Sequence, residues 1–305
     1  MITISIFFYL VLTLYITAIL AYWLPKLLSQ TLYLHAGFFY DENTLFDNSW
    51  LTYGTDYALA LFTGGGAIFT FTNCGHSVLL RRSCSLLICY CFSVSIGGFA
   101  HQYYLTLKDL NTYQFRVLWS LCVAFVTISG GFIGSIGTQL AMIINNKNQN
   151  EKFFKIFVIP EWVWLIWGIL PTAFVFLGTL SMKRPACDIF IAGITQTAPS
   201  TYVFLVLLSN KWVVKNGKVG GGLSQGKRKR EFNQSLLNVG KILLMVGIYL
   251  NAPLLPLYPQ LVSLNLDLGT INAILHSWLA VAWGLQFWGL RNFCKVFPEK
   301  KIKDL

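Results

Sequence analysis

Long apolar runs alternate with short polar stretches along this chain. Eight segments are predominantly apolar over roughly 20 residues, which is the length of α-helix needed to cross the hydrocarbon core of a bilayer. They cover residues 2–24, 53–75, 84–105, 116–144, 160–181, 188–208, 236–258 and 268–290. The pattern predicts an all-α fold, a polytopic transmembrane helical bundle of eight spans.

The first apolar segment, residues 2–24, determines this count. It lacks the positively charged start of a secretory signal peptide and is longer than the apolar part of one. We therefore expect an uncleaved membrane anchor. Cleavage of this segment as a signal would leave seven spans.

Composition supports a membrane protein. Only 11% of the 305 residues are charged, against about 25% in soluble domains. The net charge of +11 would suggest a nucleic-acid partner in a soluble protein, but membrane proteins accumulate lysine and arginine in their cytoplasmic loops. We therefore expect membrane lipids as partners and no nucleic acid.

Lysine and arginine also predict the orientation, because they concentrate on the cytoplasmic side. The segments 209–235 and 291–305 are basic, whereas 25–52 carries acidic residues and 259–267 has no lysine or arginine. We expect one integral membrane domain over 1–305, with a lumenal or extracellular segment at 25–52. The basic loop 209–235 and the C-terminal tail 291–305 would be cytoplasmic.

The last residues read KKIKDL, with Lys301 and Lys303 fifth and third from the end. This spacing resembles the dilysine retrieval signal that endoplasmic reticulum membrane proteins carry on cytosolic tails. It predicts the endoplasmic reticulum or a related endomembrane. The alternative is an ordinary solvated basic tail.

Small residues predict where helices meet, because they let transmembrane backbones approach closely. Gly97 and Gly98 stand shortly before His101, and Gly130 and Gly134 are spaced by one helical turn. We expect close helix packing at both places.

Asp56, His101 and His276 are ionisable residues inside the predicted spans, whereas Lys241 and Glu161 lie near cytoplasmic ends and can extend to the surface. Such residues are costly in lipid, face the bundle interior and are candidates for function. The alternating topology puts Asp56 and His101 near the outer surface, and His276 roughly 12 Å below it at about 1.5 Å per residue. All three fall in the lumenal half of the bilayer, so we expect them to converge.

Neutral polar residues are expected at a similar depth. Asn272 lies one turn before His276 on the same helix face, while Gln196 and Asn251 belong to the sixth and seventh predicted spans. We interpret these three as candidate ligand-binding residues.

An aspartate and two histidines that face one another suit two chemistries. In the first, Asp56, His101 and His276 ligate zinc and leave a position open for water, which the metal would convert to a hydroxide for hydrolysis. In the second, they form a metal-free network in which Asp56 orients a histidine that binds a ligand or relays protons. A purely structural cluster is the third interpretation, with hydrogen bonds worth about 0.6–2 kcal/mol each.

Short motifs at these residues resemble a family of uncharacterised multi-span membrane proteins. They are TDYALAL at the start of an early span, GGFAHQ at the end of the next, and NAILHSWLAVAWGLQFWGLR as the last span. That family is similar to the CREST superfamily, which includes alkaline ceramidases and progestin- and adiponectin-receptor-like proteins. The resemblance implies a helical bundle with a zinc site near one membrane face and the catalytic or metal-ligating residues Asp56, His101 and His276.

Two positions depart from that superfamily. The hydrolases carry His-x-x-x-His in the last span, where this chain has His276 followed by Ala280, and a serine one turn before the early histidine, where it has Gly97. Zinc would then require Asp56 or His35 as a further ligand. Three functions remain open. The first is a CREST-like hydrolase of a lipid amide or ester. The second is a non-catalytic receptor or transporter-like protein that binds a lipid or small molecule, and the third is a membrane scaffold.

Overall fold

The structure is a computed structural model that describes residues 47–73, 77–110, 112–147, 156–181, 188–208, 223–251, 261 and 264–297. Over these ranges it contains helices and no strand, so the all-α prediction is confirmed there. The helices are α3 (Trp50–Asn73), α4 (Val78–Tyr103), α5 (Leu107–Leu110), α6 (Tyr113–Lys147), α7 (Glu161–Ser181), α8 (Asp188–Leu208), α9 (Leu223–Asn251) and α11 (Leu268–Val296).

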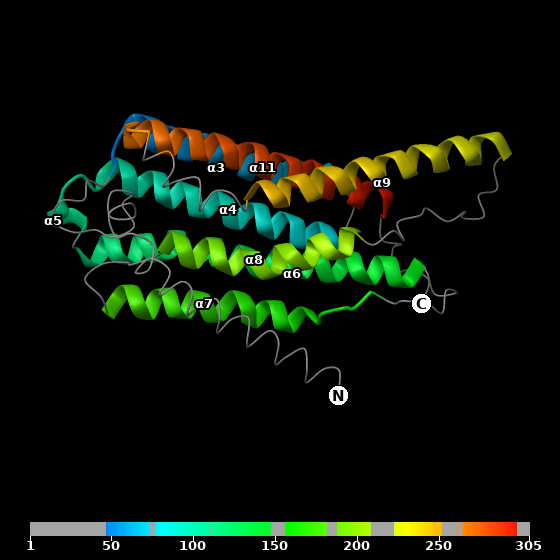
Figure 1. Cartoon of the computed structure of the whole chain (residues 1–305), viewed down its shortest axis with the longest axis horizontal. Helices are drawn as coiled ribbons and strands as arrows, with labels where there is room; N and C mark the ends of the chain where they lie inside the picture. Colours follow the sequence, from blue (N-terminus) through cyan, green and yellow to red (C-terminus); the bar gives the residue numbers. More distant parts are fainter. Residues whose placement is uncertain are drawn as a thin grey trace.

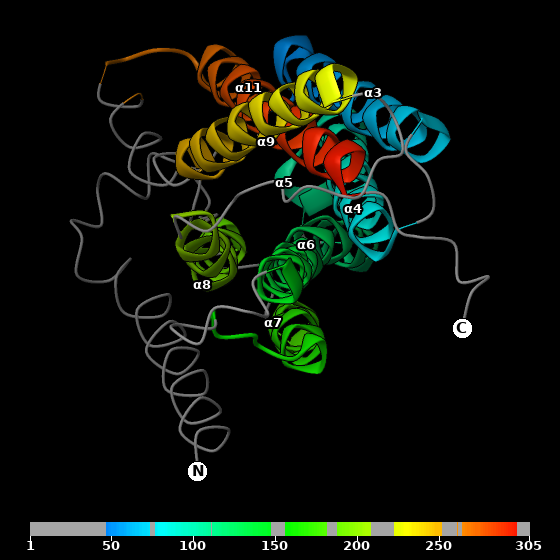
Figure 2. The same ribbon diagram turned by 90° about the vertical axis from the view of Figure 1, so that its right-hand side faces the viewer.

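The long helices lie side by side in one elongated bundle (Figure 1). Figure 2, which looks along the bundle, shows α3, α9 and α11 on one side and α7 and α8 on the other. Helices α4 and α6 join the two sides: α4 packs against α3 and α6, and α6 packs against α7 and α8. Helix α11 packs against α9 and α3.

The two ends of the bundle differ in the helix termini that they contain. Short helix α5 connects the end of α4 to the start of α6, and the starts of α3 and α11 lie at this same end (Figure 1). We call it the α5 end. The opposite end contains the starts of α4 and α7 and the ends of α3, α6 and α11, and we call it the Glu161 end.

Capping residues fix several helix starts by accepting hydrogen bonds from otherwise unpaired backbone N–H groups. The Ser77 hydroxyl accepts from the Leu80 N–H at 2.9 Å. The Asp267 carboxylate accepts from the Thr270 N–H at 2.9 Å. Helix α4 therefore begins at Val78, six positions before the predicted start at residue 84.

Helix α9 also begins earlier than predicted, at Leu223 instead of residue 236. Part of the predicted basic segment 209–235 is therefore helical, from residue 223 onward. The stretch SQGKRKREFNQ is polar, which hides it from a search for spans, but lysine, arginine, glutamine and glutamate are good helix formers. Figure 1 shows this basic part of α9 extending beyond the other helices.

Three of the described helices are long and apolar enough to cross a membrane, namely α4, α6 and α11. This agrees with an integral membrane protein, but the predicted number of eight spans is not supported. Asp56 and several threonines and glycines lower the apolar character of α3, and the first half of α9 is basic. The predicted span 2–24, most of segment 25–52 with His35, and the tail from residue 298 lie outside the described residues.

Glycines let the helices cross closely, as predicted. A Cβ added to Gly130 would lie 3.0 Å from the Thr195 carbonyl oxygen of α8, and one added to Gly134 would overlap the Trp164 ring of α7. Helices α9 and α11 meet in the same way, because a Cβ on Gly289 would lie 2.8 Å from the Leu244 nitrogen. Larger residues at these positions would force the helices apart.

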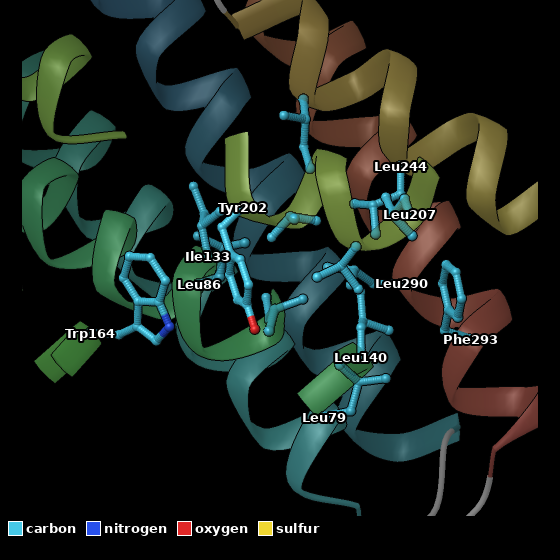
Figure 3. Close-up of a cluster of buried hydrophobic side chains, with 14 of the residues drawn as sticks. Leu79, Leu86, Ile133, Leu140, Trp164, Tyr202, Leu207, Leu244, Leu290 and Phe293 are labelled. Carbon is cyan, nitrogen blue, oxygen red and sulfur yellow. The ribbon is translucent and has the colours of Figure 1, made fainter. Parts of the chain in front are cut away.

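The hydrophobic core contains side chains of α3, α4, α6, α7, α8, α9 and α11. Figure 3 shows its central side chains, which come from helices far apart in sequence: Leu79, Leu86, Ile133, Leu140, Trp164, Tyr202, Leu207, Leu244, Leu290 and Phe293. The Tyr90 ring is fully buried and stacks on Trp283 with ring centroids 3.9 Å apart.

Candidate functional site at the α5 end

Helices α3 and α11 bring Asp56 and His276 into contact. His276 Nε2 lies 3.3 Å from Asp56 Oδ1, and Asp56 is only 3% exposed. The second carboxylate oxygen, Oδ2, is buried and has no hydrogen-bond partner within the described part of the chain. The predicted convergence of these two residues is therefore present, and one oxygen of the pair is left without a donor.

Thr55 fixes the other side of the His276 ring. Its Oγ1 lies 2.6 Å from the Leu51 carbonyl oxygen and 3.0 Å from that of Thr52, so the hydroxyl proton is directed to the α3 backbone. Oγ1 also lies 2.8 Å from His276 Nδ1. Because the hydroxyl has a single proton, the arrangement that satisfies all these contacts has His276 Nδ1–H as the donor to Oγ1.

This tautomer has a consequence for the Asp56–His276 contact. With Nδ1 protonated, a neutral His276 has a bare Nε2 that faces Asp56 Oδ1, and two lone pairs would repel each other. One proton between Nε2 and Oδ1 removes that conflict, either as imidazolium with carboxylate or as neutral imidazole with carboxylic acid. The geometry therefore calls for one shared proton.

Asp47, just before α3, organises the outermost layer of the site. Its Oδ2 accepts from the Asn272 side-chain amide at 2.8 Å and from the Thr52 hydroxyl. Its Oδ1 accepts from the Ser49 N–H at 2.9 Å. Asn272 therefore belongs to the same polar cluster as His276, as predicted, and links α11 to the start of α3.

His101, near the end of α4, belongs to this outer layer. Its Nδ1 lies 2.6 Å from the Asp47 carbonyl oxygen, which can only accept, so Nδ1 carries a proton. The ring meets Trp119 of α6 edge-on, with centroids 5.5 Å apart. His101 therefore joins α4 to the segment before α3 and to α6.

The two glycines before His101 allow α3 and α4 to meet at the site. A Cβ on Gly98 would lie 3.0 Å from the Asp56 Cβ, and one on Gly97 would lie 3.7 Å from Asp56 Oδ2. A hydrogen bond from the Tyr57 hydroxyl to the Gln102 side chain, at 2.7 Å, supports the same crossing. The close approach predicted from these glycines is confirmed.

The site offers a poor geometry for zinc. Three or four protein ligands must converge on one point at about 2 Å, and among the described residues no group of three His, Cys, Asp or Glu side chains does so. Asp56 and His276 face each other, while His101 Nδ1 donates to a backbone carbonyl. The arrangement suits a metal-free hydrogen-bonded network better.

Two predicted ligand-binding residues have other surroundings. The Gln196 amide of α8 donates to Ser129 Oγ at 3.0 Å and to the Val126 carbonyl oxygen at 3.3 Å, so it joins α8 to α6. Asn251, at the end of α9, has a buried amide with no partner within the described residues. Neither makes a hydrogen bond to the cluster around Asp56.

Sequence reasoning missed Asp47, Thr52 and Thr55 as members of the site. The stretch DNSW before α3 carries a signal for Asp47, because an aspartate two residues before a backbone N–H commonly forms an Asx turn. Thr55 has no such signal, since a threonine inside a helix ordinarily bonds only to the preceding turn.

A second polar cluster lies at the Glu161 end and joins three helices. Arg82 of α4 donates to Glu161 Oε2 at 2.5 Å, and Gln139 of α6 donates to Oε1 at 2.5 Å. The Arg82 and Glu161 side chains are 36% and 30% exposed. Each carboxylate oxygen of Glu161 therefore accepts a hydrogen bond from a different helix.

No protein-family model, curated protein or solved structure matches this chain. The resemblance to the CREST superfamily therefore rests on the short motifs alone.

Proposed function

We propose that this chain is a non-catalytic, receptor- or transporter-like membrane protein whose α5-end cluster is a metal-free site that holds a proton between Asp56 and His276. The observation that best supports this proposal is the pair of contacts made by the His276 ring: Nε2 faces Asp56 Oδ1, and Nδ1 faces the Thr55 hydroxyl. Buried pairs of this kind are typical of proton relays and ligand counter-ions within membranes.

The unpartnered Asp56 Oδ2 supports a binding role. A purely structural junction would be expected to satisfy both oxygens, as Glu161 does, because an unmade hydrogen bond costs about 1–3 kcal/mol. An acceptor kept without a donor is suited to a proton or to a donor group of a small polar ligand.

Orientation and location are part of the proposal. The lysines and arginines Arg81, Arg82, Lys147 and Lys295 all lie at the Glu161 end, which we propose is cytoplasmic. The α5 end would then face the lumen of the endoplasmic reticulum or a related compartment. Protease protection of a C-terminal epitope in sealed microsomes tests this: a tail that is digested without detergent agrees with it.

The shared proton can be tested by infrared difference spectroscopy of the purified protein during a pH titration. We expect a carboxyl signal in wild type that is absent in Asp56→Asn and altered in His276→Gln. Asp109→Asn is the matched control, since Asp109 is a carboxylate at the same end whose hydrogen bond with the Thr106 hydroxyl is exposed. Its replacement should leave the Asp56 signal unchanged.

Metal analysis of the same preparations distinguishes the proposed metal-free site from a zinc-dependent hydrolase. Stoichiometric zinc in wild type, lost in both His101→Ala and His276→Ala, would overturn the proposal in favour of a metal-dependent enzyme. An infrared spectrum unaffected by Asp56→Asn would contradict proton binding at this pair.

A further inference from the structure

A cluster of two aromatic rings and one arginine lies on the surface near the Glu161 end, around Arg291 of α11. The Arg291 guanidinium carbon lies 4.9 Å from the centre of the Phe69 ring of α3 and 4.8 Å from that of Trp288. Both rings are largely on the surface, with Phe69 40% and Trp288 45% exposed. Two aromatic side chains therefore hold one cation at the edge of the bundle.

The cation has no anionic partner within the described residues. The ion pairs there involve Arg82 with Glu161 and His276 with Asp56, and neither includes Arg291. Its Nε is buried and makes no hydrogen bond in this part of the chain. A guanidinium offers five N–H donors and strongly prefers a carboxylate or phosphate.

The position of Arg291 along α11 identifies the level of the membrane that it occupies. Helix α11 begins at Leu268, and Arg291 is its first lysine or arginine, after a long apolar stretch. Lys295 follows one turn later on the same face and is exposed. Aromatic and basic residues at the end of an apolar helix are typical of the headgroup level of a bilayer.

We propose that Arg291, held between Phe69 and Trp288, binds the phosphate group of a membrane phospholipid. The guanidinium would donate two parallel hydrogen bonds to the phosphate oxygens. The exposed rings would lie against the start of the acyl chains, and Lys295 would favour anionic headgroups. The proposal does not depend on the Asp56–His276 pair.

The test titrates phosphatidylglycerol into dodecylmaltoside micelles that contain the purified full chain, and counts bound lipid by native mass spectrometry. Arg291→Gln should weaken binding about tenfold or more, because it removes a charge-assisted hydrogen bond. Arg291→Lys should give intermediate affinity, since lysine keeps the charge but loses the planar fork. Arg81→Gln is the matched control: this exposed arginine at the same end should be replaceable without effect.

Three results would overturn the proposal. The first is wild-type affinity in Arg291→Gln, or in Arg291→Lys where the glutamine variant does not fold. The second is an equal loss in Arg81→Gln, which would indicate only diffuse attraction to positive charge. The third is displacement of the lipid by inorganic phosphate at the same concentration, which would identify a simple anion site.

Discussion

The two ends of the bundle each contain a carboxylate that joins helices, but in different states. Glu161 is partly exposed, and each of its oxygens accepts from a side chain of another helix, Arg82 or Gln139. Asp56 is 3% exposed, contacts only His276, and keeps Oδ2 without a partner among the described residues. The better-satisfied carboxylate is therefore the one that lies nearer to solvent.

This difference separates a structural junction from a candidate site. A half-exposed ion pair contributes little to stability, and water can replace either partner. A buried, half-satisfied carboxylate costs free energy that the surrounding structure must supply, and such cost is common at functional sites. Substitutions at one end of the bundle at a time should therefore produce different responses at the two ends.

The largest effect is expected for His276→Ala. It leaves Asp56 buried without the His276 ring that faces it, and breaking a buried pair from one side costs about 3–5 kcal/mol of unfolding free energy. Denaturation in mixed micelles, followed by circular dichroism, measures this loss. Adding Asp56→Asn to the variant should recover much of it by removing the stranded charge.

The control for this variant is the neighbouring Ser277→Ala. Ser277 is exposed, and its hydroxyl bonds only to the Ala273 carbonyl oxygen of its own helix. It should leave stability close to wild type. Equal losses in both variants would mean that the Asp56–His276 pair has no special role.

Thr55→Val should have the next largest effect. The change keeps the shape of the side chain but leaves His276 Nδ1–H without its acceptor, at about 1–3 kcal/mol for a buried unpaired donor. Thr63→Val is the matched control, because its hydroxyl bonds only to the Leu59 and Ala60 carbonyl oxygens of the same helix. Mixed-micelle denaturation should rank Thr55→Val as clearly the more costly; the reverse order would remove Thr55 from the site.

The sequence could predict part of this site because helix geometry determines depth. Asp56 and His276 were expected at one end of the bundle, and they meet there. Depth does not determine the direction around a helix axis, which depends on packing. Gln196 is one such case: the close crossing of α6 and α8 at Gly130 turns it toward Ser129 instead of Asp56.

Hydrogen bonds from side chains to the backbone could not be predicted from the sequence, for a different reason. His101 donates to the carbonyl of Asp47, a group that every residue carries and that no pattern identifies. The helix positions of α3, α6, α7, α8 and α11 were predictable because apolar periodicity and length mark them. The start of α9 was not, because its first turns are basic and only the helix propensity of their residues favours a helix there.

Glu161→Gln tests the other side of the comparison and should have a smaller effect. The pair with Arg82 is exposed enough that we expect a loss below about 1 kcal/mol. Because solvent ions reach this end, the loss should shrink when salt rises from about 0.05 to 0.5 M. The loss in His276→Ala should not change with salt, since Asp56 is buried. A salt-independent loss of several kcal/mol in Glu161→Gln would show that the two ends do not differ in this respect.

The smallest loss of stability is expected for Asp267→Ala. Asp267 is an exposed carboxylate at the α5 end that caps α11, so it can be compared with the buried carboxylate Asp56 at the same end. Hydrogen bonds from the Thr270 hydroxyl, at 2.5 Å, and the Thr270 N–H lower the pKa of Asp267 below its usual value. A carboxyl group with a lowered folded-state pKa stabilises the fold above its unfolded pKa of about 3.9, and that contribution is lost as pH falls through the folded value. The melting temperature of Asp267→Ala should therefore lie slightly below that of wild type at pH 7, and this difference should disappear below about pH 4.

A difference in melting temperature that persists in acid would mean that the Asp267 side chain acts by packing and not as a charged cap. A gap as large as that of His276→Ala would erase the distinction between the exposed and buried carboxylates at this end.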